Sequence, residues 1–595
     1  MQVLSEISIR NFRSCRDLSS VRLADFTPIV GYNNAGKSNI LGAIRWLLRR
    51  SVLERSDFFD PSEPLCVEAV IRGIDAGVLS LLEDRHASRI RPFLDKGCLR
   101  IRRVQPSPRC SAGDVRLKVF DPSKSSSGPD AWNDNPTGID NAISLLFPEP
   151  IDIAAMDDLT KDIGKYESSS TIGKLLAQLM ITLRGARGGE IQQRIDQLRS
   201  VFESDGVHRA SEFSEFDHRA NSIISEFFPG VAVKVHIPAP ELQMLFKGGS
   251  LRVFDLPSHA DGPDSLGRDV ATLGHGAQRA IQMSLIKLLA DSAASSDSGR
   301  TLLLVDEPEL HMHPQAVVKV RSALRKLAAG PYQVVVSTHS PMMIDRKDIG
   351  PTVMIHKSAS GETRVRRSLA GAIDALEAGS GAQIDEIFSM ASAAEVLFTN
   401  RVILAEGKTE RELLPDLFEG CLGAPLAHRQ VGLVELRGSG NIVKCLRVLQ
   451  AADIPVRALA DLDFAFKHAI DAKLLQREDP DLALCLANLA DVDNKTGSAI
   501  HGACKADKRK RREEIERMAK SEPTLSAIKR LHEKLKNHDI WLWTGGAIEQ
   551  HLGMTCKSRE AIEEMRARLR NEGSQAVRDL DEVVACLRWL ADEQV

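Results

Sequence analysis

The first 50 residues carry three hydrophobic patterns in succession. Residues 3–10 alternate apolar and polar positions, as a half-buried strand does, and residues 26–30 form a short apolar run that stops at Gly31. After Ser38, apolar residues recur at helical spacing, at Ile40, Leu41, Ile44, Leu47 and Leu48. The pattern predicts two strands and a helix, with a glycine-containing turn before the helix.

The middle of the chain changes character twice. Residues 105–140 are rich in Pro, Ser, Gly and Asp, which predicts a mobile loop. Residues 155–228 show a helical pattern and predict an insertion of packed helices, whose apolar stripes need a partner surface.

Four short apolar runs farther on predict buried parallel strands, because each ends in polar residues or glycine and helical stretches separate them. They are residues 302–305, 334–336, 402–404 and 458–460. A glycine- and serine-rich stretch at 358–395 interrupts the pattern and predicts a domain break.

The composition is that of a globular protein with more than one core. The 595 residues are 43% hydrophobic and 27% charged, which excludes a collagenous or wholly disordered chain. The net charge is -3, so contact with nucleic acid requires a local basic patch. No C-x-x-C pair occurs, no signal peptide is recognisable, and no apolar window reaches the roughly 18 residues of a membrane helix. We expect a soluble cytoplasmic protein without a membrane partner.

The predicted turn at residues 31–38 fits the phosphate-binding pattern G-x-x-x-x-G-K-[ST] between a strand and a helix. The turn lets backbone N–H groups face phosphate oxygens, Lys37 can reach the β- and γ-phosphates, and Ser38 can bind Mg²⁺. The nucleotide-binding residues expected here are Gly31, Asn33, Asn34, Gly36, Lys37 and Ser38.

Two later strand ends complete this candidate nucleotide site. Asp306 and Glu307 follow the apolar run at 302–305, where Asp306 can hold the Mg²⁺ shell and Glu307 can polarise the attacking water. His339, after the run at 334–336, can sense the γ-phosphate; a surface histidine after a strand is the alternative.

These motifs resemble the ATPases of the ABC/SMC/RecF class. The resemblance rests on I-S-I-R-N-F-R-S at the start, D-E-P-E-L-H-M-H-P from Asp306 and S-T-H-S-P around His339. In that class, a signature loop of one protomer completes the nucleotide site of the other. Gly274, Gly276 and Gln278 take that position, although the sequence of the segment departs from the usual S-G-G-Q. No glutamine between Ser38 and about residue 110 marks the Q-loop of the class.

The second half carries acidic residues at the ends of two predicted parallel strands. Glu406 ends the run at 402–404, Glu410 follows in the first turn of a helix, and Asp461 and Asp463 end the run at 458–460. Carboxylates gathered in this way repel one another unless a divalent cation binds, and oxygen ligands suit Mg²⁺ or Mn²⁺. An N-capped helix is the alternative for the first pair.

In this order and spacing, the acidic residues resemble the Toprim fold of topoisomerases, primases and some nucleases. No tyrosine occurs after Tyr332, which argues against a tyrosyl-DNA topoisomerase step, and the cysteine module of a RecR-like mediator is absent. An ABC-type P-loop ATPase domain joined to a C-terminal Toprim domain resembles the OLD (overcoming lysogenisation defect) family of ATP-dependent nucleases. This family includes the nuclease of the Gabija anti-phage system.

The resemblance implies an α/β fold: a P-loop ATPase domain with a helical insertion, followed by a Toprim domain with a Rossmann-like parallel sheet. The expected segments are 1–150 and 235–390 for the ATPase domain, 151–234 for a dimerising helical insertion and 391–595 for the Toprim domain. It also implies a second metal site with Glu549, and a Lys557 that neutralises charge on the scissile phosphate. Gly438 to Gly440 resembles the loop between the two acidic motifs.

The function expected is an ATP-hydrolysing, metal-dependent DNA endonuclease in phage defence or DNA processing. We expect Glu307, Glu406, Asp461 and Lys557 to be catalytic, and Ser38, Asp306, Glu406, Glu410, Asp461, Asp463 and Glu549 to bind metal. The alternatives are a DNA-binding protein of the RecF/SMC type with a non-catalytic Toprim lobe, and a primase-like nucleotidyl transferase.

The expected partners are DNA and one or more further copies of the chain, as a homodimer or a higher homo-oligomer. The Gabija resemblance leaves room for a helicase partner. Residues 501–570 hold 17 Lys and Arg against 11 Asp and Glu, a net of 17 − 11 = +6. The densest run, residues 505–512, is either a DNA-backbone contact or a solvated helix face.

Overall fold

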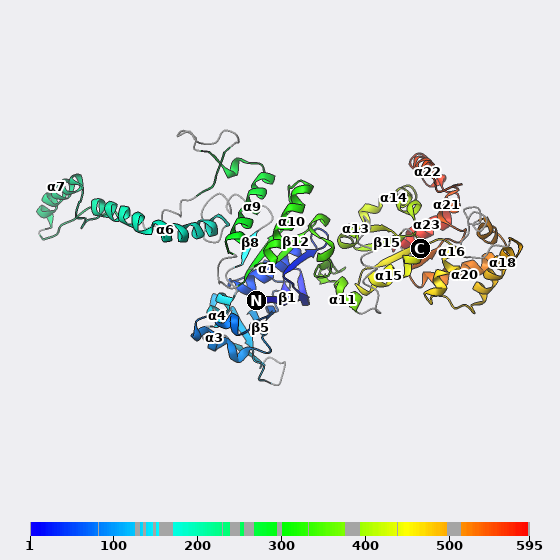
Figure 1. Ribbon diagram of the computed structural model, residues 1–595, viewed down its shortest axis with the longest axis horizontal. Helices are drawn as coiled ribbons and strands as arrows, with labels where there is room; N and C mark the ends of the chain where they lie inside the picture. The colour runs from blue at the N-terminus through cyan, green and yellow to red at the C-terminus, as the bar shows by residue number, and fades with distance from the viewer. Residues whose placement is uncertain are drawn as a thin grey trace.

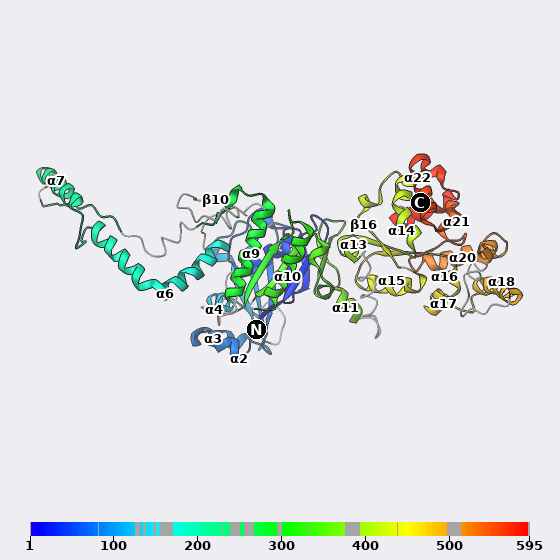
Figure 2. The same ribbon diagram turned by 45° about the horizontal axis from the view of Figure 1, so that its top comes forward.

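The computed structural model describes most of the chain. The described residues are 2–80, 82–124, 131–134, 139–146, 150–153, 171–228, 230–238, 250–254, 267–293, 300–330, 332–374, 393–436, 438–496 and 513–592. Two lobes lie side by side, and a helical arm extends from the first lobe on the side away from the second (Figures 1 and 2). Within the described residues, no helix is long and apolar enough to span a membrane.

The first lobe contains an antiparallel sheet. Its strand order is β2-β1-β4-β5-β6-β7. The strands are β1 (Val3–Phe12), β2 (Cys15–Arg22), β4 (Leu65–Arg72), β5 (Leu99–Gln105), β6 (Arg116–Phe120) and β7 (Trp132–Asp134). The loop predicted at 105–140 is therefore wrong over β6 and β7. The Pro- and Ser-rich sequence around these strands favoured a loop prediction, because the apolar–polar alternation within them is short. Pairing at the edge of the sheet stabilises both strands.

A mainly parallel sheet forms the centre of this lobe, in the order β14-β13-β3-β12-β11-β8. Its strands are β3 (Phe26–Val30), β8 (Ile151–Ile153), β11 (Thr301–Asp306), β12 (Tyr332–Thr338), β13 (Val353–Lys357) and β14 (Thr363–Val365). Helix α1 (Lys37–Leu48) packs between the two sheets, and its apolar stripe joins their common core. Helices α9 (His275–Ala293) and α10 (Pro314–Ala328) cover the opposite face. The strands predicted at 302–305 and 334–336 are confirmed.

The helical arm consists of α6 (Thr171–Phe202) and α7 (Ser211–Phe227), and it confirms helices within the predicted insertion. Smaller elements of this lobe are α2 (Ala76–Ser80), α3 (Asp84–Ile90), α4 (Ile139–Leu146), β9 (Arg252–Val253) and β10 (Arg268–Asp269).

The second lobe contains a four-stranded parallel sheet in the order β16-β15-β17-β18. The strands are β15 (Arg401–Ala405), β16 (Val431–Glu435), β17 (Val456–Ala460) and β18 (Ile540–Leu542). The two strands predicted in this half are confirmed as β15 and β17. Helices cover both faces, as a fully buried parallel sheet requires. One face carries α14 (Lys408–Leu422), α21 (Ile548–Leu552), α22 (Arg559–Glu572) and α23 (Leu580–Ala591). The other carries α15 (Ile442–Ala451), α16 (Asp463–Phe466), α17 (His468–Asp471), α18 (Pro480–Thr496) and α20 (Thr524–Lys536).

One of the apolar clusters extends through both lobes. Val30 and Met354 of the first lobe belong to the same buried cluster as the β15 and β17 residues of the second. Helices α11 (Leu369–Asp374) and α13 (Ala393–Phe398) lie between the lobes, and α11 packs on α15. Arg366 also donates to the backbone carbonyl of Asn400 at 2.9 Å. The predicted break at 358–395 thus contains β14 and α11, and residues 375–392 lie outside the described residues.

Candidate active sites

The phosphate-binding loop joins β3 to α1, as the sequence predicts. Gly36 has a φ of 107°, and a side chain there would meet Thr363 of β14. Thr363 donates to the backbone carbonyl of Ala35 at 2.8 Å and bonds Ser14 at 2.7 Å. Asn34 also takes a left-handed conformation, with a φ of 67°. The β13–β14 hairpin therefore holds the loop in a fixed conformation.

Lys37 lies at the centre of the first candidate site. Its side chain is 4% exposed, and its Nζ donates to the backbone carbonyls of Gly31 at 3.1 Å and Tyr32 at 3.2 Å. Nζ also lies 3.1 Å from Nδ1 of His339. Burial lowers the pKa of Lys37 to about 8, although the nearby carboxylate of Glu307 opposes the shift. A buried cation against turned backbone fits the phosphate chain of a nucleotide.

The acidic residues after β11 face this lysine. Ser38 Oγ donates to Asp306 Oδ1 at 3.1 Å, so the two residues expected to hold Mg²⁺ are adjacent. Nε2 of His339 lies 2.8 Å from Oε1 of Glu307. His339 thus connects Lys37 to the carboxylate expected to polarise water. Glu307 has a φ of 46°, a strained conformation for a side-chain-bearing residue.

Glu309 is a supporting residue that sequence reasoning missed. Its Oε1 accepts from Thr338 Oγ1 at 2.7 Å and from the backbone N–H groups of His339 and Ser340 at 2.6 and 3.1 Å. It therefore fixes the turn that carries His339. The last acidic residue of D-E-P-E was the signal that could have found it.

The signature segment begins at α9. Gln278 is 3% exposed, and its side-chain amide donates to the backbone carbonyls of Leu273 at 2.8 Å and Ala271 at 3.3 Å. Gln278 thus folds back on its own loop. The following Arg279 donates to the Asp306 carbonyl at 2.8 Å and ties this segment to the end of β11. A side chain at Gly276 would lie 2.7 Å from the His311 carbonyl oxygen, and Gly274 has open space around it.

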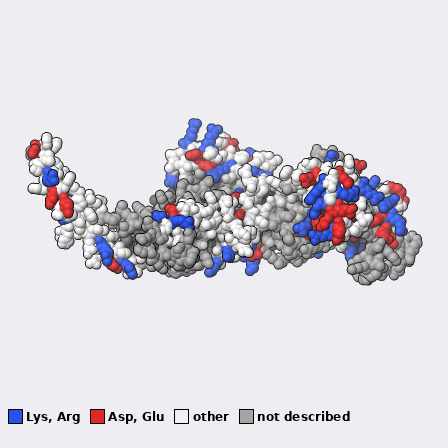
Figure 3. Space-filling model, turned by 90° about the horizontal axis from the view of Figure 1, so that it is seen from above, with Lys and Arg blue, Asp and Glu red and all other residues white. Residues whose placement is uncertain are grey.

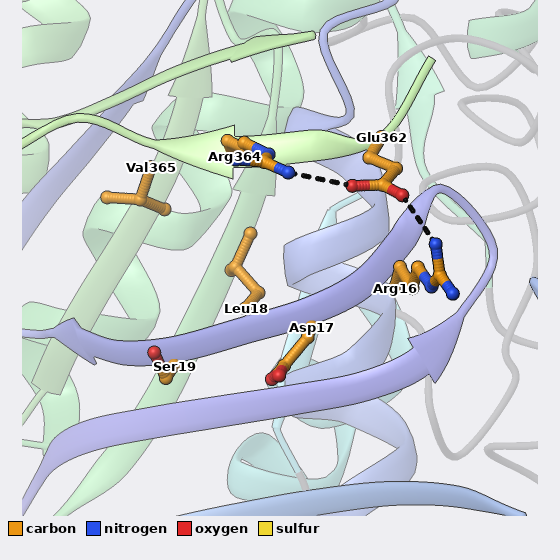
Figure 4. Close-up of a pocket in the computed structure, with 7 residues that line it drawn as sticks. All are labelled: Arg16, Asp17, Leu18, Ser19, Glu362, Arg364 and Val365. Carbon is orange, nitrogen blue, oxygen red and sulfur yellow. Dashed lines mark hydrogen bonds and ion pairs between the residues drawn. The ribbon is translucent and has the colours of Figure 1, made fainter. Parts of the chain in front are cut away.

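A cavity of about 460 Å³ lies between β2 and the β13–β14 hairpin (Figure 4). Glu362 points between two guanidinium groups, 3.1 Å from Arg16 and 3.2 Å from Arg364. Hydrogen bonds from these arginines lower the pKa of Glu362. The ionised carboxylate offsets their charge, so this cavity is a poor site for another anion.

The second candidate site lies at the carboxyl ends of β15 and β17. Oε2 of Glu406 accepts the backbone N–H of Asp461 at 2.9 Å, so the two strand ends meet. Glu410, in the first turn of α14, is 1% exposed. Asp463 begins α16, and its charge acts on Glu406. The structure thus brings together the four carboxylates that the sequence placed here.

Glu549 and Lys557 complete this cluster. Glu549 is fully buried at the start of α21 and accepts from Thr409 Oγ1 at 2.7 Å. Nζ of Lys557 lies 3.1 Å from Asp461 and 3.4 Å from Glu549. Although burial opposes it, the surrounding carboxylates raise the pKa of Lys557 above its ordinary value. Thr409 was not predicted; its place beside Glu410 in the same helical turn was the available signal.

Burial disfavours the ionised form of these carboxylates. Burial and the charge of Asp463 raise the pKa of Glu406 to about 7. Burial likewise raises the pKa of Glu410, and burial with the charge of Glu406 raises that of Asp461. Within the described residues, Oε1 of Glu410 and Oδ1 of Asp461 are buried without a hydrogen-bond partner. These free carboxylate oxygens fit a divalent cation.

Comparison with known proteins identifies a domain family in each lobe. The family described as overcoming lysogenization defect protein-like, TOPRIM domain, matches residues 397–463, and the AAA ATPase domain matches residues 3–84 and 192–344. A structure of an Smc head bound to the C-winged helix domain of ScpA is 16% identical, with a TM-score of 0.36 over 61% of this chain and 97% of that one.

Two nucleases are similar over most of the chain. The OLD nuclease of Thermus scotoductus is 23% identical, over 78% of this chain and 82% of that protein. The Old nuclease of Escherichia phage P2 is 35% identical over 566 residues, which cover 94% of each chain. The chain therefore joins an ATPase domain to a Toprim domain and belongs to the OLD nuclease family.

Proposed function

We propose that this protein is a DNA endonuclease that uses Mg²⁺ or Mn²⁺ at the Toprim cluster and ATP at the P-loop, in phage defence or DNA processing. The observation that carries the proposal is the burial of Glu410 and Asp461 with carboxylate oxygens that no described residue bonds. A lobe without chemistry would gain nothing from keeping these charges buried and close together, because such a cluster costs stability.

Each residue has a distinct role in the proposed cleavage. Two divalent cations, when bound, activate a water and stabilise the leaving oxygen. Glu406, Asp461 and Asp463 would hold the first, and Glu410 and Glu549 the second. Lys557 presents a cation beside Asp461, where it can neutralise charge on the scissile phosphate.

The ATPase site supports binding and hydrolysis of ATP. Lys37 would bind the β- and γ-phosphates, and Ser38 with Asp306 would hold Mg²⁺. A γ-phosphate that draws Lys37 and His339 would free Glu307 to orient water, because His339 bonds both residues.

A cleavage assay on supercoiled plasmid tests the proposal. We expect nicking with Mg²⁺ or Mn²⁺, none with EDTA, and no protein–DNA adduct after denaturation. Asp461→Ala should lower nicking at least about 100-fold, because a direct ligand is removed, while ATP binding is unchanged. Undiminished nicking by Asp461→Ala, purified free of other nucleases, would disprove the assignment.

We also propose a homodimer formed through the helical arm. Phe216, Ile223, Phe227 and Phe228 are exposed at its end, with Phe227 72% exposed. Such an apolar surface favours a partner, and a second copy presents the same surface under twofold symmetry. Gly274, with open space around it, would face the nucleotide of the other protomer.

A further inference from the structure

The loop between β18 and α21, residues 543–547, supports the main chain around Asp461. The first residue of the loop donates its N–H to the carbonyl of Ala460 at 3.0 Å. The carbonyl of Gly546 accepts the N–H of Leu462 at 2.7 Å. The loop therefore holds the chain on both sides of Asp461, and it leads directly into the helix that carries Glu549. Its position sets the spacing between the two proposed cation sites.

The imidazole of His551 holds this loop. The imidazole is 3% exposed, and its Nε2 lies 3.0 Å from the backbone N–H of Gly545. Because that N–H can only donate, Nε2 accepts, and the ring proton lies on Nδ1. Nδ1 then donates to Asp579 at 2.8 Å, which fixes the ring orientation.

A second carboxylate holds the preceding residue. Glu582, on α23, accepts the backbone N–H of Thr544 at 3.1 Å and its hydroxyl at 2.6 Å. Consecutive N–H groups of the loop are thus held by side chains that lie outside the catalytic cluster.

These three side chains look at first like another metal site. Ligand atoms of His551, Asp579 and Glu582 lie within 4.8 Å of one another. Both imidazole nitrogens, however, already make hydrogen bonds, and the Nε2 lone pair points at Gly545. A side chain at Gly545 would lie 2.8 Å from Nε2, so the loop packs directly on the ring. These three side chains therefore support the loop, and they do not form a metal site.

We propose that His551, oriented by Asp579, is a positioning residue that sets the distance between Asp461 and Glu549. The proposal rests on the proposed nuclease function. It predicts that loss of the Nε2 acceptor weakens cation binding at the cluster without affecting the ATPase site or DNA affinity.

Mn²⁺ binding tests this role without relying on cleavage. Purified full-length protein without nucleotide is titrated with Mn²⁺, and the free ion is measured by electron paramagnetic resonance; Asp461→Ala provides the reference for a missing site. His551→Leu should weaken Mn²⁺ binding by about 10- to 100-fold, the usual cost of losing support behind a metal ligand. It should also lower the kcat of nicking while the KM for DNA stays parental.

Two further variants separate positioning from general destabilisation. His551→Gln keeps an acceptor near the Nε2 position and should restore Mn²⁺ affinity to within about threefold of the parent. Leu449→Ala, in the buried core on the other face of the sheet, should lower the Tm and leave Mn²⁺ affinity unchanged. Parental affinity in His551→Leu, or an equal loss in Leu449→Ala at a temperature where both are folded, would overturn the proposal.

The experiments distinguish failure of the positioning role from failure of the proposed nuclease function. If Mn²⁺ binding depends on Asp461 and His551 as expected but no protein nicks DNA, the nuclease function fails and the positioning role stands. If the parent nicks DNA, and His551→Leu nicks DNA with the same dependence on Mn²⁺ concentration, the positioning role is wrong and the nuclease function stands.

Discussion

At the residue scale, one imidazole connects the lysine and the carboxylate of the candidate ATPase site. His339 lies 3.1 Å from Lys37 through Nδ1 and 2.8 Å from Glu307 through Nε2. Glu309 fixes the backbone of this histidine. We expect Lys37 to act in nucleotide binding and Glu307 in the chemical step.

This division predicts different outcomes for two substitutions. Lys37→Ala should abolish tight nucleotide binding, because it removes the cation that faces the phosphates. Glu307→Gln should bind nucleotide normally and hydrolyse it about 100-fold or more slowly, because the water-polarising carboxylate is gone. Equilibrium binding of labelled ATP and single-turnover hydrolysis measure the two effects. Parental hydrolysis by Glu307→Gln would show that this assignment is wrong.

The Toprim carboxylates predict a pH-dependent stability of the metal-free protein. Glu406 ionises near its ordinary pKa of 4.5 in the unfolded chain and at about 7 in the folded one. Between these values the folded state retains a proton that the unfolded state has released. Stability should therefore decrease as pH rises from 5 to 7, by at most about 1.4 kcal/mol per pH unit for this group.

Calorimetry in EDTA across pH 5 to 8 measures this effect. Glu406→Gln stays neutral, so its Tm should exceed that of the parent at pH 8 and match it near pH 5. Glu563→Gln, an exposed position on α22, serves as the control and should follow the parent. The same pH slope in Glu406→Gln and the parent would contradict the prediction.

Residues close to a strand end were predictable from the sequence, and residues that act across the fold were not. Glu406 and Asp461 follow apolar runs, and parallel strands end at one edge of a sheet, so their meeting was foreseeable. The supporting roles of Glu309 and His551 depend on bonds to distant turns or helices, which no local pattern reveals. Gln278 fitted the signature motif, but its inward hydrogen bonds to its own loop appear only in three dimensions.

At the element scale, the helical arm combines charged side chains with exposed apolar residues. Figure 3 shows scattered acidic and basic side chains along it, and a denser, mixed charge over the second lobe. Its α7 helix leaves large apolar residues exposed, and the sequence predicted that such stripes need a partner. The pattern revealed the need for a partner surface but not how far the helices extend from the lobe.

The arm therefore predicts an effect of charge on assembly. Phe216→Glu combined with Phe227→Glu should shift a dimer toward monomer at micromolar concentration, because each charge would be buried in the interface. Light scattering with and without ATP measures the mass. Arg194→Glu, an exposed position on α6, is a charged control that should remain dimeric. A monomeric parent with ATP present would contradict the proposed homodimer.

The mixed charge of the second lobe bears on how DNA is held. A cavity of about 550 Å³ between α14 and α22 is lined by four basic residues, Lys408, Arg411, Arg566 and Arg570. Each forms an ion pair with a carboxylate, so they offer no unbroken basic patch. The basic run at 505–512 lies outside the described residues and remains our candidate for DNA contact.

Charge reversal tests this candidate. Arg509→Glu, Lys510→Glu and Arg511→Glu together should reduce the slope of log affinity against log salt. The expected reduction is about 0.9 for each phosphate of double-stranded DNA that the protein no longer neutralises. Fluorescence anisotropy with a labelled duplex at several salt concentrations measures the slope. The same three changes should leave Mn²⁺ binding unaltered, and an unchanged slope would remove the run from the DNA interface.

At the scale of the whole molecule, the ATPase and Toprim lobes are packed against each other. Val30, at the end of the P-loop strand, and Met354, of the hairpin that holds the P-loop, belong to the same buried cluster as the β15 and β17 residues. A change in P-loop conformation that moved the β13–β14 hairpin would therefore disturb the packing of the Toprim core. Mixed α/β lobes were foreseeable from the alternating pattern, whereas this continuity was not.

The shared core determines where the protein can be cut into pieces for separate expression. A fragment that starts at residue 391, where the sequence suggested a boundary, would lack α11. The face of α15 that packs on α11 would then be exposed. Leu369 and Ala372, both 0% exposed in the full chain, belong to the apolar cluster that such a cut divides. The ATPase fragment would in turn present Met354 and Ile349 to water. Each half taken alone is thus expected to aggregate, and nuclease activity is best dissected by point substitution in the full-length enzyme.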